Sequence, residues 1–150
     1  MNFYLKKIDN KKKNLPLLLL ADPEEAAVDK YLPQCEVLEL YCDDILVGQG
    51  AVMEISPESC ELKNMAVYEK YHRLGYGKKL LELLCEFYKE KYLYITVGTS
   101  EQGIIFYQKC GFKISHVIKN FFIDNYSEPI FENGSQCIDM TCLSINTREQ

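Results

Sequence analysis

Apolar residues recur along this chain at two spacings, and each spacing predicts a different kind of element. Alternating or β-rich apolar stretches predict strands over residues 3–8, 36–42, 45–55, 60–68, 92–97, 112–123 and 137–145. Helical spacing predicts helices over residues 15–21, 22–32 and 101–110, and a longer one that carries Leu80, Leu81, Leu84, Phe87 and Tyr88. With no repeat and no linker, this order predicts one mixed α/β domain over residues 1–150.

Capping and turn residues set several of the expected boundaries. Asp22 is expected to cap the helix 22–32, with Pro23 in its first turn. The strand 112–123 is expected to bend near Asn120, and residues 125–136 are expected to form a long polar loop.

The turn His72-Arg73-Leu74-Gly75-Tyr76-Gly77-Lys78 lies between a predicted strand and the longest predicted helix. Its two glycines let the backbone approach a bulky ligand closely. The N-terminus of the following helix presents unpaired N–H groups and a partial positive charge, which suit phosphate oxygens. The turn therefore predicts a cradle for a diphosphate.

Two other phosphate-binding fingerprints do not fit this turn. It lacks the G-x-x-x-x-G-K-S/T pattern of nucleoside triphosphate binding. The dinucleotide pattern G-x-G-x-x-G fails because Leu80 stands where the third glycine belongs.

Composition narrows the class of protein. The hydrophobic share is 47% and the net charge is −5, which argues against binding to duplex nucleic acid. The apolar run at residues 17–21 follows three lysines but is far shorter than the roughly 20 residues of a membrane span. We expect a soluble cytoplasmic protein with no nucleic-acid or membrane partner.

The seven cysteines are scattered and form no C-x-x-C pair, and neither histidine has a partner at metal-ligand spacing. Reduced cysteines that pack as small apolar side chains are expected, with no metal site.

Three stretches resemble the GNAT N-acetyltransferase superfamily: residues 61–67, residues 71–77 and residues 106–112. The second matches the acyl-CoA motif Q/R-x-x-G-x-G/A, and the third looks like the signature Y-x-x-x-G-F. Residues 17–23, 97–99, 107–112 and 128–134 further resemble a small bacterial subgroup of this superfamily whose acceptor is unassigned. The resemblance implies the GNAT fold, a single domain with a mixed sheet and splayed central strands, and acetyl-CoA as cosubstrate.

The resemblance also assigns a set of cofactor-binding residues. They are Met65, Ala66, Val67, His72, Arg73, Leu74, Gly75, Tyr76, Gly77, Lys78 and Ser100. His72 stands where the superfamily usually has Gln or Arg, and Ser100 where it commonly has an Asn that contacts the cofactor arm.

Two residues are candidates for catalysis. By the resemblance, Tyr107 matches the general acid that protonates the departing thiolate, while as an ordinary residue it is a core tyrosine on a short helix. Glu61 matches a general base that works through water in some superfamily members, or is a solvated carboxylate on a strand. Lys63 lies two residues further on, and either lowers the pKa of Glu61 or is simply exposed.

The resemblance implies direct transfer of an acetyl group from acetyl-CoA to a primary amine of a small molecule or peptide. The alternative is a GNAT-fold module that binds acyl-CoA without turnover, as a sensor or partner subunit. An acidic, aromatic segment (Asp124, Tyr126, Glu128 and Glu132) is either a rim for a cationic amine or a solvated loop. A homodimer through residues 121–123 and 137–145 is left open.

Overall fold

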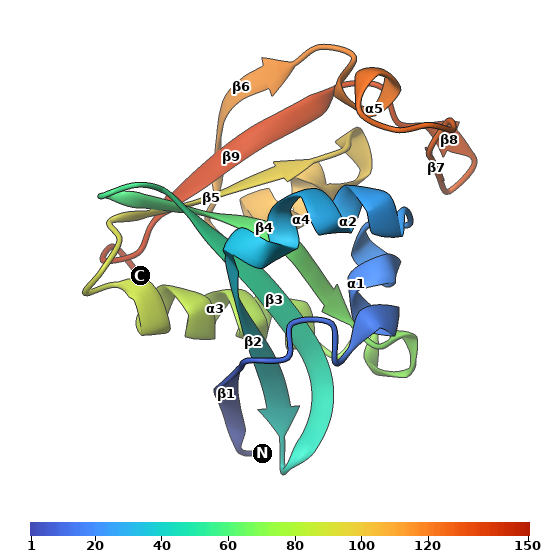
Figure 1. The fold of residues 1–150 in the computed structure, drawn as a ribbon. Coiled ribbons are helices and arrows are strands. Elements are labelled where there is room, and N and C mark those ends of the chain that lie inside the picture. Colours follow the sequence, from blue (N-terminus) through green and yellow to red (C-terminus); the bar gives the residue numbers. More distant parts are fainter.

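The computed structural model describes all 150 residues and contains a mixed sheet of seven strands with helices on both faces (Figure 1). The sheet strands are β1 (Phe3–Ile8), β2 (Cys35–Cys42), β3 (Ile45–Ser56), β4 (Ser59–Val67), β5 (Tyr94–Thr99), β6 (Lys113–Ile118) and β9 (Met140–Asn146). The short strands β7 (Phe131–Glu132) and β8 (Ser135–Gln136) form a separate hairpin. The helices are α1 (Leu15–Ala21), α2 (Glu25–Tyr31), α3 (Tyr76–Tyr88), α4 (Ile104–Lys109) and α5 (Phe121–Asp124), with 3-10 turns η1 (Leu32–Gln34), η2 (Glu69–Tyr71) and η3 (Glu101–Gly103).

The strand order is β1-β2-β3-β4-β5-β9-β6, so β1 and β6 form the two edges. Only β4 and β5 run parallel to each other. The prediction of a mixed α/β sheet of seven strands in one domain is confirmed.

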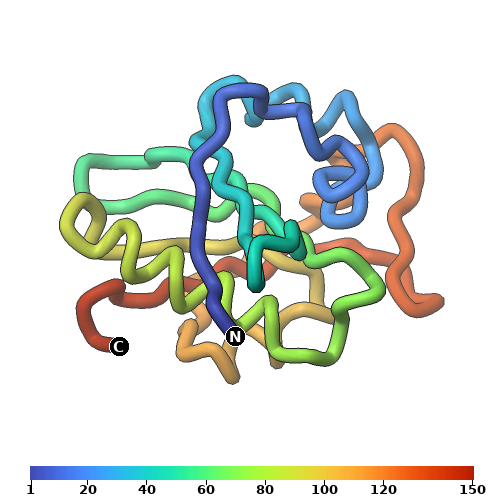
Figure 2. Tube along the Cα trace, turned by 90° about the horizontal axis from the view of Figure 1, so that it is seen from below, coloured from blue at the N-terminus to red at the C-terminus, as the bar shows by residue number.

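Side chains of alternate residues of β2 belong to two separate cores. Leu38 lies in the larger core, which packs the sheet against Leu80 and Leu84 of α3. Val37 lies in the smaller core, with Val28 of α2 and Leu18 of α1. Alternate residues of a strand face opposite sides of its sheet, so α3 covers one face and α1–α2 the other. Figure 2 shows the blue α1–α2 segment lying apart from the yellow-green α3.

The two parallel strands diverge part-way along their length. Their pairing ends at Leu62 and Val97. Beyond that point β4 stays paired with β3 as far as Val67, whereas β5 follows β9 through Thr99. Residues 63–67 therefore have an unpaired backbone edge on the side that faces β5, in the middle of the sheet.

A bulge in β4 coincides with this divergence. Ala51 of β3 pairs with Asn64 and Val52 pairs with Leu62, so Lys63 has no partner across the pair. In a regular strand Leu62 and Asn64 would face the same side, but Leu62 lies in the α3 core and the Asn64 amide donates to α1. The extra residue thus turns the strand so that its second half presents different side chains to each face.

The expected start of the second helix is wrong. That helix begins at Glu25, and Asp22 instead forms the C-cap of α1, where its N–H donates to Leu18. Asp22 precedes Pro23 and has extended backbone (φ −144°, ψ 100°), because proline disfavours helical geometry in the residue before it.

The strand expected over residues 112–123 is also shorter than predicted. β6 ends at Ile118, Asn120 has a left-handed backbone (φ 57°), and α5 follows directly. The Asp139 carboxylate accepts the N–H of Asn120 at 2.9 Å and fixes this reversal.

Two strand boundaries and one loop differ as well. β5 begins at Tyr94 and β9 at Met140, two and three residues later than expected. The loop at 125–136 contains the β7–β8 hairpin, whose turn residues Asn133 and Gly134 have positive φ, as the tightest hairpin turns require. No helix of the protein combines the length and the apolar character that crossing a membrane requires.

Candidate active site

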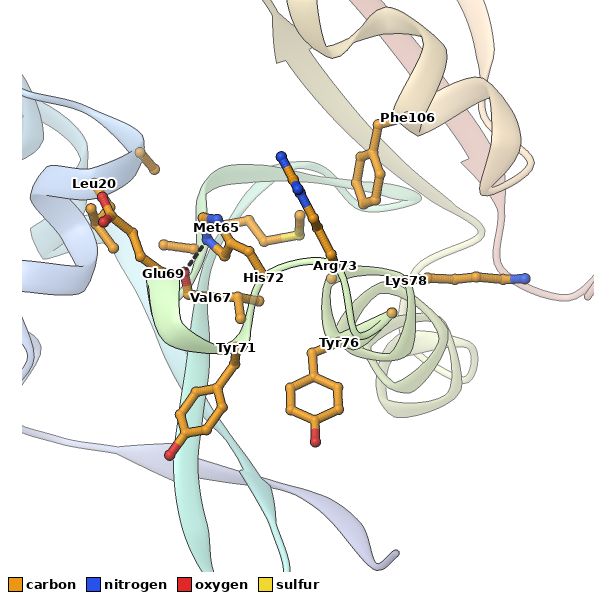
Figure 3. A pocket seen from close by; sticks show the side chains of 14 residues that line it. Leu20, Met65, Val67, Glu69, Tyr71, His72, Arg73, Tyr76, Lys78 and Phe106 are labelled. Carbon is orange, nitrogen blue, oxygen red and sulfur yellow. Dashed lines mark hydrogen bonds between the residues drawn. The ribbon is translucent and has the colours of Figure 1, made fainter.

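A cavity of about 640 Å³ lies between the end of β4, the start of α3 and the C-terminal part of α1; we call it the α3 cavity (Figure 3). Its walls include Met65, Ala66, Val67 and Phe106. Most of the remaining lining comes from η2 and the glycine turn, namely Glu69, Tyr71, His72, Arg73, Gly75, Tyr76, Gly77 and Lys78.

The glycine turn directs backbone N–H groups at this cavity. Gly75 is the N-cap of α3 and has φ 80°, a left-handed backbone that glycine adopts without strain. The first bond from α3 back to this turn runs from Lys79 N–H to Gly75 C=O, so the N–H groups of Tyr76, Gly77 and Lys78 have no backbone acceptor. These free donors and the dipole of a 13-residue helix favour an anionic guest.

Gly77 lies where three elements converge. A Cβ at this position would lie 3.2 Å from the Phe106 ring and 3.8 Å from the Met65 side chain. A larger residue would crowd the Phe106 ring and take up space in the cavity that Gly77, Phe106 and Met65 line, which explains why a glycine stands here.

His72 ties the turn to the end of β4. Its Nε2 lies 2.7 Å from the carbonyl oxygen of Val67. A carbonyl can only accept, so Nε2 carries the proton in this bond. The His72 side chain therefore acts on the protein's own backbone and positions the turn.

Charged side chains of the turn differ in direction. Figure 3 shows the Arg73 side chain extending away from the α3 ribbon on the side where Phe106 lies, while Lys78 points away from the other labelled side chains. Arg73 can add positive charge inside the cavity, and Lys78 contributes chiefly its backbone. Leu74 is exposed and does not line the cavity.

Tyr107 lies on α4 one residue after Phe106. Its ring packs edge-to-face between Phe106 at 5.1 Å and Phe112 at 5.4 Å. Burial, with a smaller effect from Cys110, raises the pKa of Tyr107 to about 12. The hydroxyl makes no hydrogen bond within the chain and is not sealed from solvent, so it keeps its proton and is free to donate it.

A second cavity of about 340 Å³ lies next to α2; we call it the α2 cavity. Glu61 and Lys63 of β4 and Gly98 of β5 form the part that borders the divergence of the two strands. The carboxylate of Glu61 lies 3.2 Å from the Lys63 ammonium. That ammonium also lies 5.4 Å from the ring centroid of Tyr31.

Asp22 joins three segments at the wall of the α2 cavity. One of its carboxylate oxygens accepts the hydroxyl of Tyr31 at 3.0 Å, and the other accepts the hydroxyl of Tyr126 at 2.9 Å. The amide of Asn64 in turn donates to the Tyr31 hydroxyl at 3.1 Å. Burial raises the pKa of both tyrosines, and the Asp22 charge raises them further, so both remain neutral donors.

Comparison with known proteins agrees with this geometry. The family model described as "Acetyltransferase (GNAT) domain" matches residues 33–114. The uncharacterized N-acetyltransferase YvbK of Bacillus subtilis (strain 168) is 40% identical over 136 residues, which are 87% of this chain and 86% of that protein. The chain belongs to the GNAT acetyltransferase family.

Two solved GNAT structures match the fold over its whole length. A GNAT family acetyltransferase from Elizabethkingia anophelis with acetyl-CoA bound has a TM-score of 0.89 and 35% identity, and covers 97% of this chain and 98% of its own. A Bacillus subtilis acetyltransferase in complex with CoA has a TM-score of 0.85 and 33% identity, and covers 97% of this chain and 99% of its own. The predicted family, fold and transferase class are thus confirmed.

Most of the residues assigned by the GNAT resemblance come together, and a few do not. Residues 65–67 and the turn residues other than Leu74 line the α3 cavity. Ser100 lies outside it and donates its hydroxyl to Glu132 at 3.0 Å. Tyr107 is next to the lining residue Phe106 but does not itself line the cavity, and Glu61 lines the α2 cavity.

Sequence reasoning missed several residues that line these two cavities. Leu20 and Phe106 line the α3 cavity, and Asp22 and Tyr31 line the α2 cavity. Of the predicted acidic, aromatic rim only Tyr126 lines the α2 cavity, because Asp124, Glu128 and Glu132 are exposed elsewhere. No local signal marks these residues, since each reaches the site through the packing of distant segments.

Proposed function

We propose that this GNAT protein transfers an acetyl group from acetyl-CoA directly to a primary amine. The observation that carries the proposal is the unpaired edge of β4 at residues 63–67, with the α3 cavity along one part of it and the α2 cavity along the other. A donor and an acceptor bound in the two cavities would meet at this edge.

The α3 cavity fits coenzyme A. Free N–H groups of Tyr76, Gly77 and Lys78 suit its diphosphate, and Arg73 supplies a neighbouring positive charge. The exposed backbone of residues 65–67 suits the amide-bearing arm, which would pair with it as an added strand does. The two relatives described above, solved with acetyl-CoA and with CoA, support the same placement. When bound, acetyl-CoA supplies an activated acyl group with a thiol as leaving group.

Glu61 is proposed as the general base. Attack requires a neutral amine, whereas an aliphatic amine is protonated at neutral pH. The Glu61 carboxylate would take this proton, directly or through one water, and its pair with Lys63 holds it at the border of the two cavities. This first proton leaves before the attack. A second proton leaves the nitrogen once its bond to carbon has formed and passes to solvent.

Tyr107 is proposed as the general acid. Its hydroxyl would donate the proton that the sulfur takes up when the thioester bond breaks, and solvent would then restore the phenol. The phenol is a weak acid because burial raises its pKa to about 12.

Binding of acetyl-CoA and its turnover can be tested separately. Acetyl-CoA should raise the Tm of the protein, because a ligand that binds the folded state alone stabilises it. An amine panel with thiol detection should then show release of free CoA that depends on the amine. A rise in Tm without thiol release would favour a binding module without turnover, and no rise in Tm would contradict the proposal itself.

A further inference from the structure

Charges in the α2 cavity are unevenly compensated. Glu61 and Lys63 neutralise each other at the end of the cavity next to β5. Lys30 also lines the cavity, but its side chain is exposed and water screens its charge. Asp22 is only 8% exposed, and no Lys, Arg or His nitrogen lies within 4.0 Å of its carboxylate.

The Asp22 carboxylate acts only as a hydrogen-bond acceptor in its contacts, and some of its acceptor positions remain unused. Each of its oxygens accepts one tyrosine hydroxyl, from Tyr31 and from Tyr126. A carboxylate has about four acceptor positions, so about two remain. A buried charge that lacks an opposite partner is costly, and a cationic ligand would remove that cost.

Besides its charged groups, the cavity is lined by the apolar side chains of Met53, Phe121 and Met140. Such walls suit a chain of methylene groups. The chain's net charge of −5 also favours the approach of cations over anions.

We infer that Asp22 binds a second positively charged group of the acceptor, which makes the preferred substrate a diamine or a longer polyamine. One nitrogen lies at Glu61 and is acetylated, the methylene chain lies along the apolar walls, and the distal ammonium lies at Asp22. This inference rests on the proposed acetyl transfer and adds the class of acceptor. Asp22 thereby acts as a specificity-determining residue.

The test compares cadaverine with pentylamine, which has the same carbon chain but only one nitrogen. Thiol release from acetyl-CoA is measured for each amine. A hydrogen-bonded ion pair in a shielded site predicts that kcat/KM for cadaverine exceeds that for pentylamine by at least about tenfold. A ratio near one in the wild-type protein overturns the inference, as does a preference for an amino acid over both amines.

Asp22→Asn tests the residue itself. Asparagine keeps the size of the side chain, but removes the charge. The cadaverine-to-pentylamine ratio should fall to near one. Glu24→Gln is the matched control, because it removes the same charge two residues away on a side chain that contacts Ser127 and does not line the cavity. Its ratio should equal that of the wild type, and an equal loss in both variants overturns the role of Asp22.

Asp22→Glu keeps the inference testable where the asparagine variant does not fold. The carboxylate then reaches one methylene further into the cavity, so the preferred diamine should become shorter, from cadaverine to putrescine. An unchanged preference for chain length contradicts the placement. If pentylamine is acetylated but no diamine preference exists, the acetyl transfer stands and the inference fails. If no amine releases thiol, the proposed function fails and the inference falls with it.

Discussion

The α3 cavity takes most of its lining from one continuous stretch between Met65 and Lys78, whereas the α2 cavity collects side chains from segments around residues 22, 31, 61 and 126. The first offers chiefly backbone groups: free N–H groups at a helix start and an unpaired strand edge. The second offers chiefly side chains: two carboxylates, two phenols and two ammonium groups.

This difference teaches how each kind of recognition is encoded. A backbone cradle needs local geometry, so it leaves a short motif with glycines at fixed positions. A side-chain cavity needs only that distant segments meet, so the residues can stand anywhere in the chain. The same contrast predicts that variants near the α3 cavity change the rate of acetyl transfer to all amines alike. Variants in the α2 cavity should instead change which amine is preferred.

The largest effect is expected at Tyr107, the proposed general acid. Tyr107→Phe should lower kcat on the order of 1,000-fold, since a positioned proton donor contributes about 100- to 10,000-fold. The rise in Tm caused by acetyl-CoA should remain. Tyr94→Phe, at an exposed position on β5, is the control and should leave kcat unchanged. A normal kcat in the Tyr107→Phe variant would remove Tyr107 from the mechanism.

The pH profile of the wild-type protein checks the same residue. Because its pKa is raised to about 12, Tyr107 stays protonated at every pH well below that value. Deprotonation of Tyr107 therefore causes no loss of kcat between pH 7 and about pH 10. A decline of kcat near the ordinary tyrosine pKa of about 10, at a pH where the protein is still folded, would contradict this assignment.

Glu61→Gln should lower kcat/KM at neutral pH by about 100-fold, because the amine then loses its proton acceptor. The loss should shrink as the pH approaches the pKa of the amine, where the neutral amine is already abundant. Measurement of kcat/KM against pH for both proteins gives this difference directly. Glu58→Gln, in the exposed turn before β4, should behave as the wild type. A loss that stays constant with pH would indicate a positioning effect instead.

Gly77→Val should weaken acetyl-CoA binding by at least about tenfold, through overpacking against Phe106 and Met65. The effect should appear equally with every amine, which distinguishes it from a change in the α2 cavity. Isothermal titration with acetyl-CoA measures it. Glu82→Ala on the solvent side of the same helix is the control, and binding of normal strength by Gly77→Val would show that the cradle lies elsewhere.

The smallest effect is expected at Ser100. Its hydroxyl is committed to Glu132 and lies outside the α3 cavity, so Ser100→Ala should change KM for acetyl-CoA by less than about twofold. Steady-state kinetics at saturating amine measures this. A larger rise in KM would show that Ser100 turns toward the cofactor arm when acetyl-CoA is bound.

The fold was predictable because its signals are local. Alternation in β2 and helical spacing in α3 indicate their elements directly, and the glycine pair at 75 and 77 indicates the cradle. Asn120 was read only as a bend in a strand, because the acceptor that fixes its left-handed backbone is Asp139, far along the chain.

The acceptor side was not predictable for the same reason. Asp22 has the sequence context of a helix cap, and only the folded chain shows its carboxylate between Tyr31 and Tyr126. The bulge at Lys63 is likewise invisible in a stretch that alternates regularly, although it decides which residues of β4 face each cavity. Long-range contacts of this kind need the structure.

The bond between Tyr126 and Asp22 joins positions 104 residues apart. During synthesis the N-terminal part of the chain leaves the ribosome first. A nascent chain therefore contains Asp22 long before it contains Tyr126, the second tyrosine that donates to it. The selectivity among amines that we propose for Asp22 is therefore acquired only when the last strands have been added.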